Sequence, residues 1–191
     1  MRILTIATLS VALAGCGTEQ PTATDVATGN EQAAETPATT ETAGATARAE
    51  LRTSGGDARG QAIVTQSGDG ISVRLEAADL EPGTYAAHIH TTGRCDPPAF
   101  ESAGGHWNPT NQQHGRDNPQ GMHKGDLPNL TVGADGRGMV EFTVAGATVT
   151  GGAMSLLDSD GAAMMIHERA DDYRTDPSGD AGSRIACGVL G

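Results

Sequence analysis

Short segments in which apolar and polar residues alternate, separated by glycine-containing turns, constrain the fold of this chain most strongly. In residues 71–77, which read ISVRLEA, the apolar side chains fall at every second position. Residues 61–67 come before them, and Gly68-Asp69-Gly70 joins the two segments, a pattern typical of a β-hairpin with one buried face. Further strands are expected at residues 47–53, 85–90, 139–144, 153–157, 162–167 and 184–189.

This pattern predicts an all-β domain, either a β-sandwich or a flattened barrel. The composition agrees, because 27 of the 191 residues are Gly and only 3% are aromatic, which argues against a helical bundle. Two stretches, residues 91–130 and 168–183, lack the alternation. Loops of this length inside a small domain are usually functional, so we expect the chemistry of the protein to lie in or beside them.

The first residues have the features of an export signal. Arg2 gives a positive start, residues 3–14 form an apolar run too short to span a membrane, and Leu13-Ala14-Gly15-Cys16 resembles the lipobox of bacterial lipoproteins. The alternative is an ordinary secretory signal that contains a cysteine. In either case residues 1–15 form a signal peptide. We expect export to the bacterial periplasm or cell envelope, with a lipid on Cys16 as the only membrane contact.

Residues 16–46 are predicted to form a disordered tether between this anchor and a folded domain. They are rich in Thr, Ala and Glu, with Val26 as the only large aliphatic side chain, so they cannot bury enough apolar surface to offset the entropy of ordering. Residues 47–191 then form a single domain, which is what a chain of 191 residues has room for.

The charge balance excludes one large class of partner. The chain has 24 Asp and Glu against 12 Lys and Arg, a net charge of −12, and it lacks a basic stripe. Proteins that bind nucleic acid neutralise phosphates with clustered Lys and Arg, so we expect no nucleic-acid partner.

The three cysteines suggest one disulfide. If Cys16 carries the lipid, Cys95 and Cys187 remain as a pair in an oxidising compartment, where a disulfide is the natural outcome. The alternative is two unpaired thiols. The bond would fasten the first long loop to the last predicted strand.

All six histidines lie between positions 88 and 167, which indicates a metal site. His88 and His90 are two apart on a predicted strand, so both imidazoles lie on the same face. The loop that follows has no apolar periodicity to fold around, and a metal would supply the missing organising centre. Its candidate ligands are His106, His114, His123 and Asp126.

The donor types fit two different ions. Three imidazoles and a carboxylate suit a closed tetrahedral zinc site. An imidazole-rich set such as His88, His90 and His167 suits copper, which cycles between two oxidation states. Residue types alone do not assign each histidine to one ion.

From Tyr85 to its last residue, the chain closely resembles the copper-zinc superoxide dismutases. The resemblance is carried by five motifs in matching order and spacing: His88-Ile89-His90, Gly104-Gly105-His106-Trp107-Asn108-Pro109, His123-Lys124-Gly125-Asp126-Leu127, Ile166-His167-Glu168, and Ala181-Gly182-Ser183-Arg184-Ile185-Ala186-Cys187-Gly188. It implies an eight-stranded Greek-key sandwich or flattened barrel with two long functional loops.

The resemblance also implies the ligand sets. Copper would be held by His88, His90, His106 and His167, and zinc by His106, His114, His123 and Asp126, so that His106 bridges the two ions. Asp171 would link the copper ligand His88 to the zinc ligand His114 without binding either ion. Arg184 would hydrogen-bond the incoming anion beside copper, and Lys124, Arg94 or Arg174 would extend the positive field around it.

The implied activity is that of an oxidoreductase, a superoxide dismutase. Through a Cu(II)/Cu(I) cycle, two superoxide anions would become O₂ and hydrogen peroxide, with His106 releasing and taking a proton, and the enzyme would protect the cell envelope. The alternatives are a non-catalytic periplasmic copper/zinc-binding module and a zinc hydrolase, which would need an open zinc position. The sequence leaves the choice between a monomer and a homodimer open.

Overall fold

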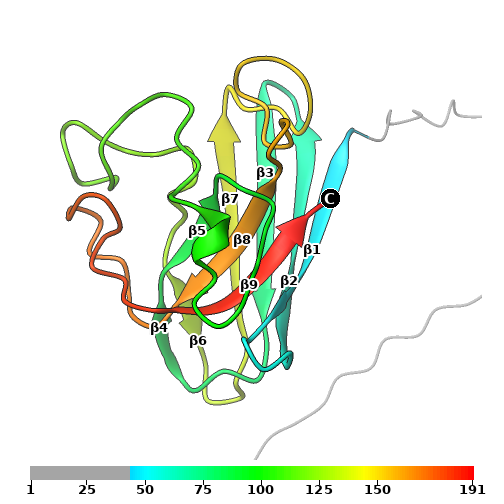
Figure 1. The fold of residues 1–191 in the computed structure, drawn as a ribbon. Coiled ribbons are helices and arrows are strands. Elements are labelled where there is room, and N and C mark those ends of the chain that lie inside the picture. Colours follow the sequence, from blue (N-terminus) through cyan, green and yellow to red (C-terminus); the bar gives the residue numbers. More distant parts are fainter. Residues whose placement is uncertain (1–43) are drawn as a thin grey trace, which may run out of the picture. The chain divides into compact units, whose positions relative to one another are not determined.

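In a computed structural model, described here for residues 44–191, nine antiparallel strands form one sheet that curls into a nearly closed barrel (Figure 1). The strands are β1 (Thr46–Arg52), β2 (Ala58–Ser67), β3 (Gly70–Ala77), β4 (Gly83–Tyr85), β5 (Ala87–His90), β6 (Leu130–Val132), β7 (Gly138–Ala145), β8 (Ala162–His167) and β9 (Arg184–Leu190). Their order in the sheet is β4-β6-β7-β3-β2-β1-β9-β8-β5. The predicted all-β fold is confirmed.

Helical structure is limited, within residues 44–191, to the single 3-10 turn Glu101–Ala103. In this part of the chain, no helix has both the length and the apolar character needed to cross a membrane. The predicted signal peptide, Cys16 and residues 16–43 of the predicted tether lie outside the described residues and stay predictions. Strand β1 begins at Thr46, one residue before the predicted domain boundary.

The alternation of the sequence sets which side chains enter the barrel. In β3 the side chains of Ile71, Val73 and Leu75 are fully buried. Between them Arg74 faces outward and pairs with Glu141 of β7 at 2.7 Å. β3 therefore buries one face and leaves the other in water, as an antiparallel sheet allows.

Strands β5 and β8 differ from the others, because every one of their residues is buried. β8 packs its inner face into the barrel, and its outer face lies under the first long loop. β5 pairs with β8 on one side, and segments of that loop pair with its other edge. His88 and His90 of β5 and His167 of β8 are consequently held on rigid, buried backbone.

Two predictions about strands were wrong in detail. Residues 153–157 are not a strand: they form a loop in which Ser155 bridges to Thr148 and Leu156 fills the end of the barrel. The predicted strand 85–90 is divided at Ala86 into β4 and β5, which lie at opposite ends of the strand order. The short strand β6 was not expected, because it lies at the end of a stretch without alternation.

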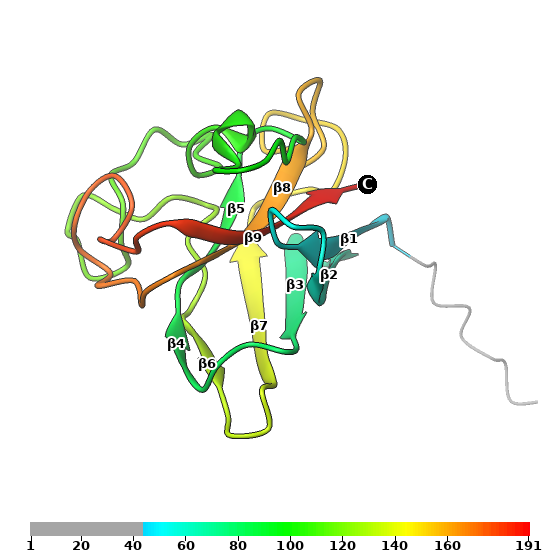
Figure 2. The same cartoon turned by 60° about the horizontal axis from the view of Figure 1, so that its bottom comes forward.

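The two long loops lie side by side on one flank of the barrel (Figures 1 and 2). Residues 91–129 connect β5 to β6, and residues 168–183 connect β8 to β9. They are joined directly, since the Asp117 amide donates to the Tyr173 carbonyl at 3.1 Å and the His114 amide donates to an Asp176 carboxylate oxygen at 2.6 Å. The predicted disulfide is present between Cys95 and Cys187, and it ties the first loop to β9.

Candidate metal centre

The first long loop brings its ligands to β5 by pairing with the free edge of that strand. The Ile89 amide donates to the Gly125 carbonyl at 2.9 Å, and the Trp107 amide donates to the Ile89 carbonyl at 2.8 Å. A side chain at position 125 would overlap the Ile89 carbonyl, so only Gly permits this approach. Trp107 itself is buried in the core, where it packs.

This pairing sets two close juxtapositions across the edge of β5. His106 lies opposite His90, and Asp126 lies opposite His88. Residues that are far apart in the sequence are thus placed on one small area of backbone, and their side chains converge on the region between β5, the end of β8 and the two loops.

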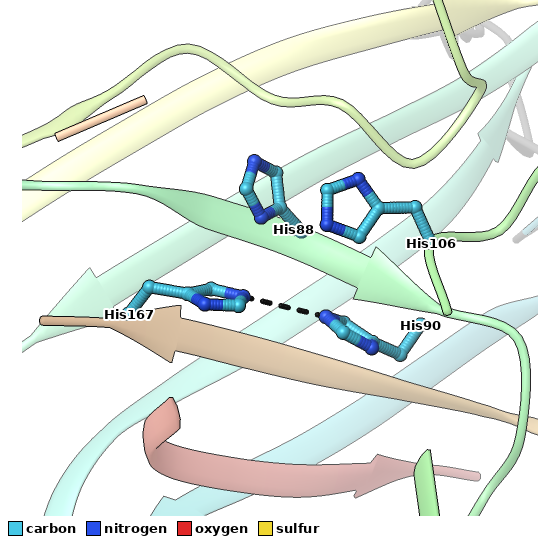
Figure 3. Close-up of side chains that lie close together, drawn as sticks. All are labelled: His88, His90, His106 and His167. Carbon is cyan, nitrogen blue, oxygen red and sulfur yellow. Dashed lines mark hydrogen bonds between the residues drawn. The ribbon is translucent and has the colours of Figure 1, made fainter. Parts of the chain in front are cut away.

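One group of four histidines forms at this place. His88, His90, His106 and His167 each offer a ring nitrogen, and these four atoms lie within 4.8 Å of one another (Figure 3). His90 and His167 point their Nε2 atoms at each other across 3.4 Å. These are the four residues predicted to hold copper.

A second group forms around one carboxylate oxygen. Asp126 Oδ1 lies 2.9 Å from His106 Nδ1, 3.1 Å from His114 Nδ1 and 3.2 Å from His123 Nδ1. These are the four residues predicted to hold zinc. A ligand atom of His88 also lies within 4.8 Å of ligand atoms of His106, His114 and Asp126. The centres of the His88 and His106 rings are 3.9 Å apart.

His106 therefore belongs to both groups, with one nitrogen available to each. Its Nδ1 faces Asp126 and His123, while its Nε2 is buried and has no hydrogen-bond partner among the described residues. Within residues 44–191, His88 Nδ1 is also buried without a hydrogen bond. Unpaired buried nitrogens destabilise a fold unless a ligand satisfies them, so the residues present fit bound metal ions.

Asp171 of the second loop fixes the orientation of two of these rings. Its Oδ2 accepts a hydrogen bond from His88 Nε2 at 2.8 Å, and its Oδ1 accepts one from His114 Nε2 at 2.9 Å. Both imidazoles thus donate from Nε2 and turn Nδ1 inward, toward the ligand groups. Asp171 therefore joins His88 to His114, the two residues that it was predicted to link.

Burial keeps most of the cluster uncharged at neutral pH. It lowers the pKa of His106 to about 4 and that of His167 to about 3, and it holds the pKa of His90 well below its ordinary value. A neutral imidazole has a free lone pair, so these histidines are ready to bind metal at pH 7.

His114 and Asp126 form the charged part of the cluster. Burial works to lower the pKa of His114, but hydrogen bonds to Asp126 and Asp171 outweigh it and raise that pKa to about 9. Burial likewise works to raise the pKa of Asp126, but hydrogen bonds from three histidines and the Gly115 amide hold it well below its usual range. The Asp126 carboxylate is therefore ionised and available to a cation.

A cavity of about 450 Å³ gives access to the four-histidine group, and Arg184 lies at its wall with His106, His167, Pro177 and Ser178. The half-buried guanidinium donates to the Phe100 carbonyl at 2.6 Å and to the Gly104 carbonyl at 2.7 Å. These two bonds fix its position.

Arg184 is the only Lys or Arg that lines this cavity within the described part of the chain. The outer residues considered from the sequence have other surroundings. Lys124 donates to the Ala145 carbonyl at 2.9 Å, Arg94 pairs with Asp96, and Arg174 is exposed in the second loop.

Sequence reasoning missed the residues that hold Asp171. The Asn129 side chain and the Tyr173 amide and hydroxyl surround it, and Arg116 covers the Tyr173 ring. The Tyr173 amide is only two residues from Asp171, but no spacing rule indicates the other contacts, because they join residues 42 or more apart that lie in irregular loops.

Comparisons with known proteins agree with this geometry. A family model described as copper/zinc superoxide dismutase matches residues 58–190. The "Superoxide dismutase-like protein YojM" of Bacillus subtilis is 47% identical over 138 residues, which cover 71% of this chain and 70% of that protein. "Superoxide dismutase [Cu-Zn] 1" of Aquifex aeolicus is 45% identical over 139 residues, 71% of this chain and 81% of that protein. The crystal structure of a SOD-like protein from Bacillus subtilis superimposes with a TM-score of 0.71 at 44% identity, covering 75% of this chain and 97% of the other.

Proposed function

Since this chain belongs to the copper/zinc superoxide dismutase family, we propose that it converts two superoxide anions into O₂ and hydrogen peroxide. The observation that carries the proposal is the placement of His106, whose Nδ1 lies in one ligand group and whose unpartnered Nε2 faces the other. A buried imidazole with both nitrogens aimed at ligand groups is suited to bridging two cations.

We assign the two ions by donor type. Copper would be held by His88, His90, His106 and His167, an all-imidazole set, and zinc by His106, His114, His123 and Asp126. When bound, copper would supply the one-electron redox chemistry that these side chains lack, and zinc would supply a fixed positive charge.

The chain's own residues orient the ligands and deliver the proton. His90 Nδ1 donates to the Gly104 carbonyl at 2.9 Å, which leaves its Nε2 bare toward the cluster. His106 Nε2 is the atom that takes and returns a proton, because it is buried, has no hydrogen-bond partner in residues 44–191, and borders the cavity. Because burial keeps His106 neutral at pH 7, its Nε2 is free to accept a proton and pass it to a departing peroxide anion, and the second proton of hydrogen peroxide would come from solvent.

Arg184 would receive the substrate. Its guanidinium is fixed at the cavity wall, where it attracts an anion into a site that the net charge of −12 otherwise repels. The Gly104 carbonyl accepts bonds from both Arg184 and His90, so the anion-binding group and a copper ligand share one anchor.

The experiment is a superoxide dismutation assay on the purified chain after loading with zinc alone and with copper plus zinc. Activity should appear only with copper, and cyanide, a copper ligand, should abolish it. A His167→Ala variant should lose copper and activity but keep zinc, because His167 lies in the four-histidine group alone.

The second candidate is a non-catalytic copper/zinc-binding module. It is favoured by the name of the Bacillus subtilis relative, which is called superoxide dismutase-like. The complete histidine set and Arg184 favour the enzyme in this chain. A protein that binds both ions but does not accelerate dismutation would be the module.

Export and anchoring form a separate part of the proposal. The positive start, the short apolar run and Cys16 support a lipid-anchored protein of the bacterial periplasm or cell envelope, which would protect that compartment from superoxide. Mass spectrometry of the mature protein from membranes tests it: the first residue should be Cys16 with a diacyl or triacyl modification.

A further inference from the structure

Asp171 can serve both metal groups only if its carboxylate stays fixed between His88 and His114. It lies in the loop of residues 168–183, which has no strand of its own to hold it. Its side chain is nevertheless fully buried, and both of its oxygens are within 2.9 Å of an imidazole nitrogen. Some other contact must therefore hold this part of the loop in place.

That contact is a closed ring of hydrogen bonds with Asn129 and Tyr173. The Asn129 side chain accepts from the Asp171 amide at 2.8 Å and donates to the Asp171 carbonyl at 2.9 Å. The Tyr173 amide donates to Asp171 Oδ1 at 2.6 Å, and the Tyr173 hydroxyl accepts from the Asn129 amide at 2.7 Å. Each of the three residues thus binds the other two.

Tyr173 adopts a backbone conformation that a non-glycine residue reaches only when its surroundings enforce it. Its φ is 62°, in the left-handed region. Here the amide faces Asp171 while the hydroxyl reaches the Asn129 amide. The local energy cost of the conformation is offset by the contacts that the ring and hydroxyl make.

Arg116 of the first loop completes the arrangement from the other side. Its guanidinium carbon lies 3.8 Å from the centre of the Tyr173 ring, a cation–π contact. The neighbouring Gly115 donates its amide to Asp126 Oδ2 at 3.0 Å. Arg116, Tyr173 and Asp126 also border an apolar cavity of about 110 Å³. The stack therefore connects the Asp171 side of the site to the Asp126 side.

We propose that Tyr173, with Arg116 stacked on its ring, is a positioning residue that fixes Asp171 and thereby couples the zinc ligand His114 to the copper ligand His88. This inference rests on the proposed function. It assigns a role to two residues that belong to neither ligand group, and it predicts that the effect of Tyr173 on the metals passes through Asp171.

The test is Tyr173→Phe, which keeps the ring and removes the hydroxyl bond to Asn129. Zinc affinity, measured by competition with a chromophoric chelator, should fall about tenfold, the size of effect usual for groups that orient a metal ligand. The Cu(II) electron-resonance spectrum of the zinc-loaded protein should also change. Arg116→Lys, which keeps the charge but loses the planar stack, should move both readouts in the same direction by a smaller amount.

Tyr85→Phe is the matched control, since Tyr85 is the other tyrosine of the chain and its hydroxyl also bonds to the backbone, donating to the Glu81 carbonyl at 2.8 Å. It should leave zinc affinity and the copper spectrum unchanged. A structural role alone would lower the melting temperatures of both variants and leave both metal readouts as in the wild type, which would overturn the inference.

A second arm tests whether the effect passes through Asp171. Tyr173→Phe should cause no further loss of zinc affinity in an Asp171→Asn background, because residues that act as a unit are not additive. Full additivity would overturn the inference even if the single variant weakens binding. A wild-type chain that binds neither ion would contradict the proposed function itself. Normal wild-type binding that is unchanged by Tyr173→Phe would contradict this inference alone.

Discussion

Arg184 is one positive charge in a strongly acidic protein, and its effect depends on where it lies. The net charge of −12 repels superoxide at long range, while Arg184 lines the cavity beside His106 and His167. A charge inside a cavity acts on a small anion more strongly than the same charge on an open surface, because water screens it less. Substrate capture should therefore depend on this residue and not on the net charge alone.

We predict that Arg184→Glu lowers the second-order rate constant for superoxide by roughly tenfold or more. It should also invert the salt dependence: the wild-type rate should fall as ionic strength rises, and the variant rate should increase as repulsion is screened. Arg174→Glu is the control, since it makes the same charge change on an exposed arginine that does not line the cavity. Equal effects of both variants would show that net charge, and not the cavity charge, controls the rate.

The sequence was informative about the ligands and Asp171, and silent about what holds Asp171 and Arg184 in place. His88 and His90 were placed on one strand face by the two-residue period, and the structure has both on β5. The remaining ligands were assigned through ordered motifs that resemble a family. The Gly104 and Phe100 carbonyls that hold Arg184 depend on how an irregular loop folds back, and no local pattern encodes that.

The first long loop takes its shape from its pairing with β5, from the disulfide and from Asp126. The disulfide spans a sequence separation of 92, for which unfolded-chain entropy gives about 4 to 5 kcal/mol. That is comparable with the entire net stability of a small domain, about 5 to 15 kcal/mol. The part of the loop near Cys95 is thus anchored covalently, and the part near His114 depends on Asp126 and the ligands around it.

We predict that Asp126→Ala weakens zinc binding and loosens the loop together. The carboxylate contacts three histidines through Oδ1, and Oδ2 accepts from the Gly115 and His123 amides, both at 3.0 Å. Zinc affinity should fall by about tenfold or more. Hydrogen exchange should accelerate across residues 106–127, and Asp117→Ala, an exposed acid in the same loop, should change neither. Loss of zinc with unchanged exchange would show that the loop is ordered independently of the ion.

Most strands were predictable from the sequence, including the fully buried β8, whose bounds match the predicted segment 162–167. The alternation located β1, β2, β3, β7 and β9 to within a few residues. The apolar segment 153–157 was misassigned, because it plugs the barrel end as a loop while keeping Leu156 buried. The three-residue strand β6 was missed because its pairing with β4 and β7 comes from the closure of the sheet, which no short window of sequence records.

The whole domain carries a buried cluster whose protonation affects folding. For His90, His106 and His167 the folded pKa lies below the ordinary value of 6.5, so the unfolded chain takes up these protons more readily. Their contribution to stability is present above pH 6.5 and is lost as the pH falls toward 4 and 3. His114, with a pKa raised to about 9, acts oppositely, and its contribution grows as the pH falls from 9 to 6.5.

We therefore predict that the chelator-treated protein is most stable near neutral pH and loses stability between pH 6.5 and 4. The measurement is the urea midpoint at pH 7.5, 6.5 and 5.0 in the presence of a chelator. Bound metal competes with protons for the same nitrogens, so in the metal-loaded protein the loss should move to lower pH. A midpoint that is equal at pH 6.5 and 5.0 without metal would contradict the prediction.

The proposed mechanism requires His106 to serve two ions at once, which anomalous diffraction from crystals of the metal-loaded protein can show. Data collected at the copper and zinc absorption edges should give two separate peaks, one beside Nε2 of His106 with the His90 and His167 rings, and one beside its Nδ1 with His114, His123 and Asp126. A single peak, or a second ion bound without His106, would contradict the shared ligand and the proton transfer assigned to it.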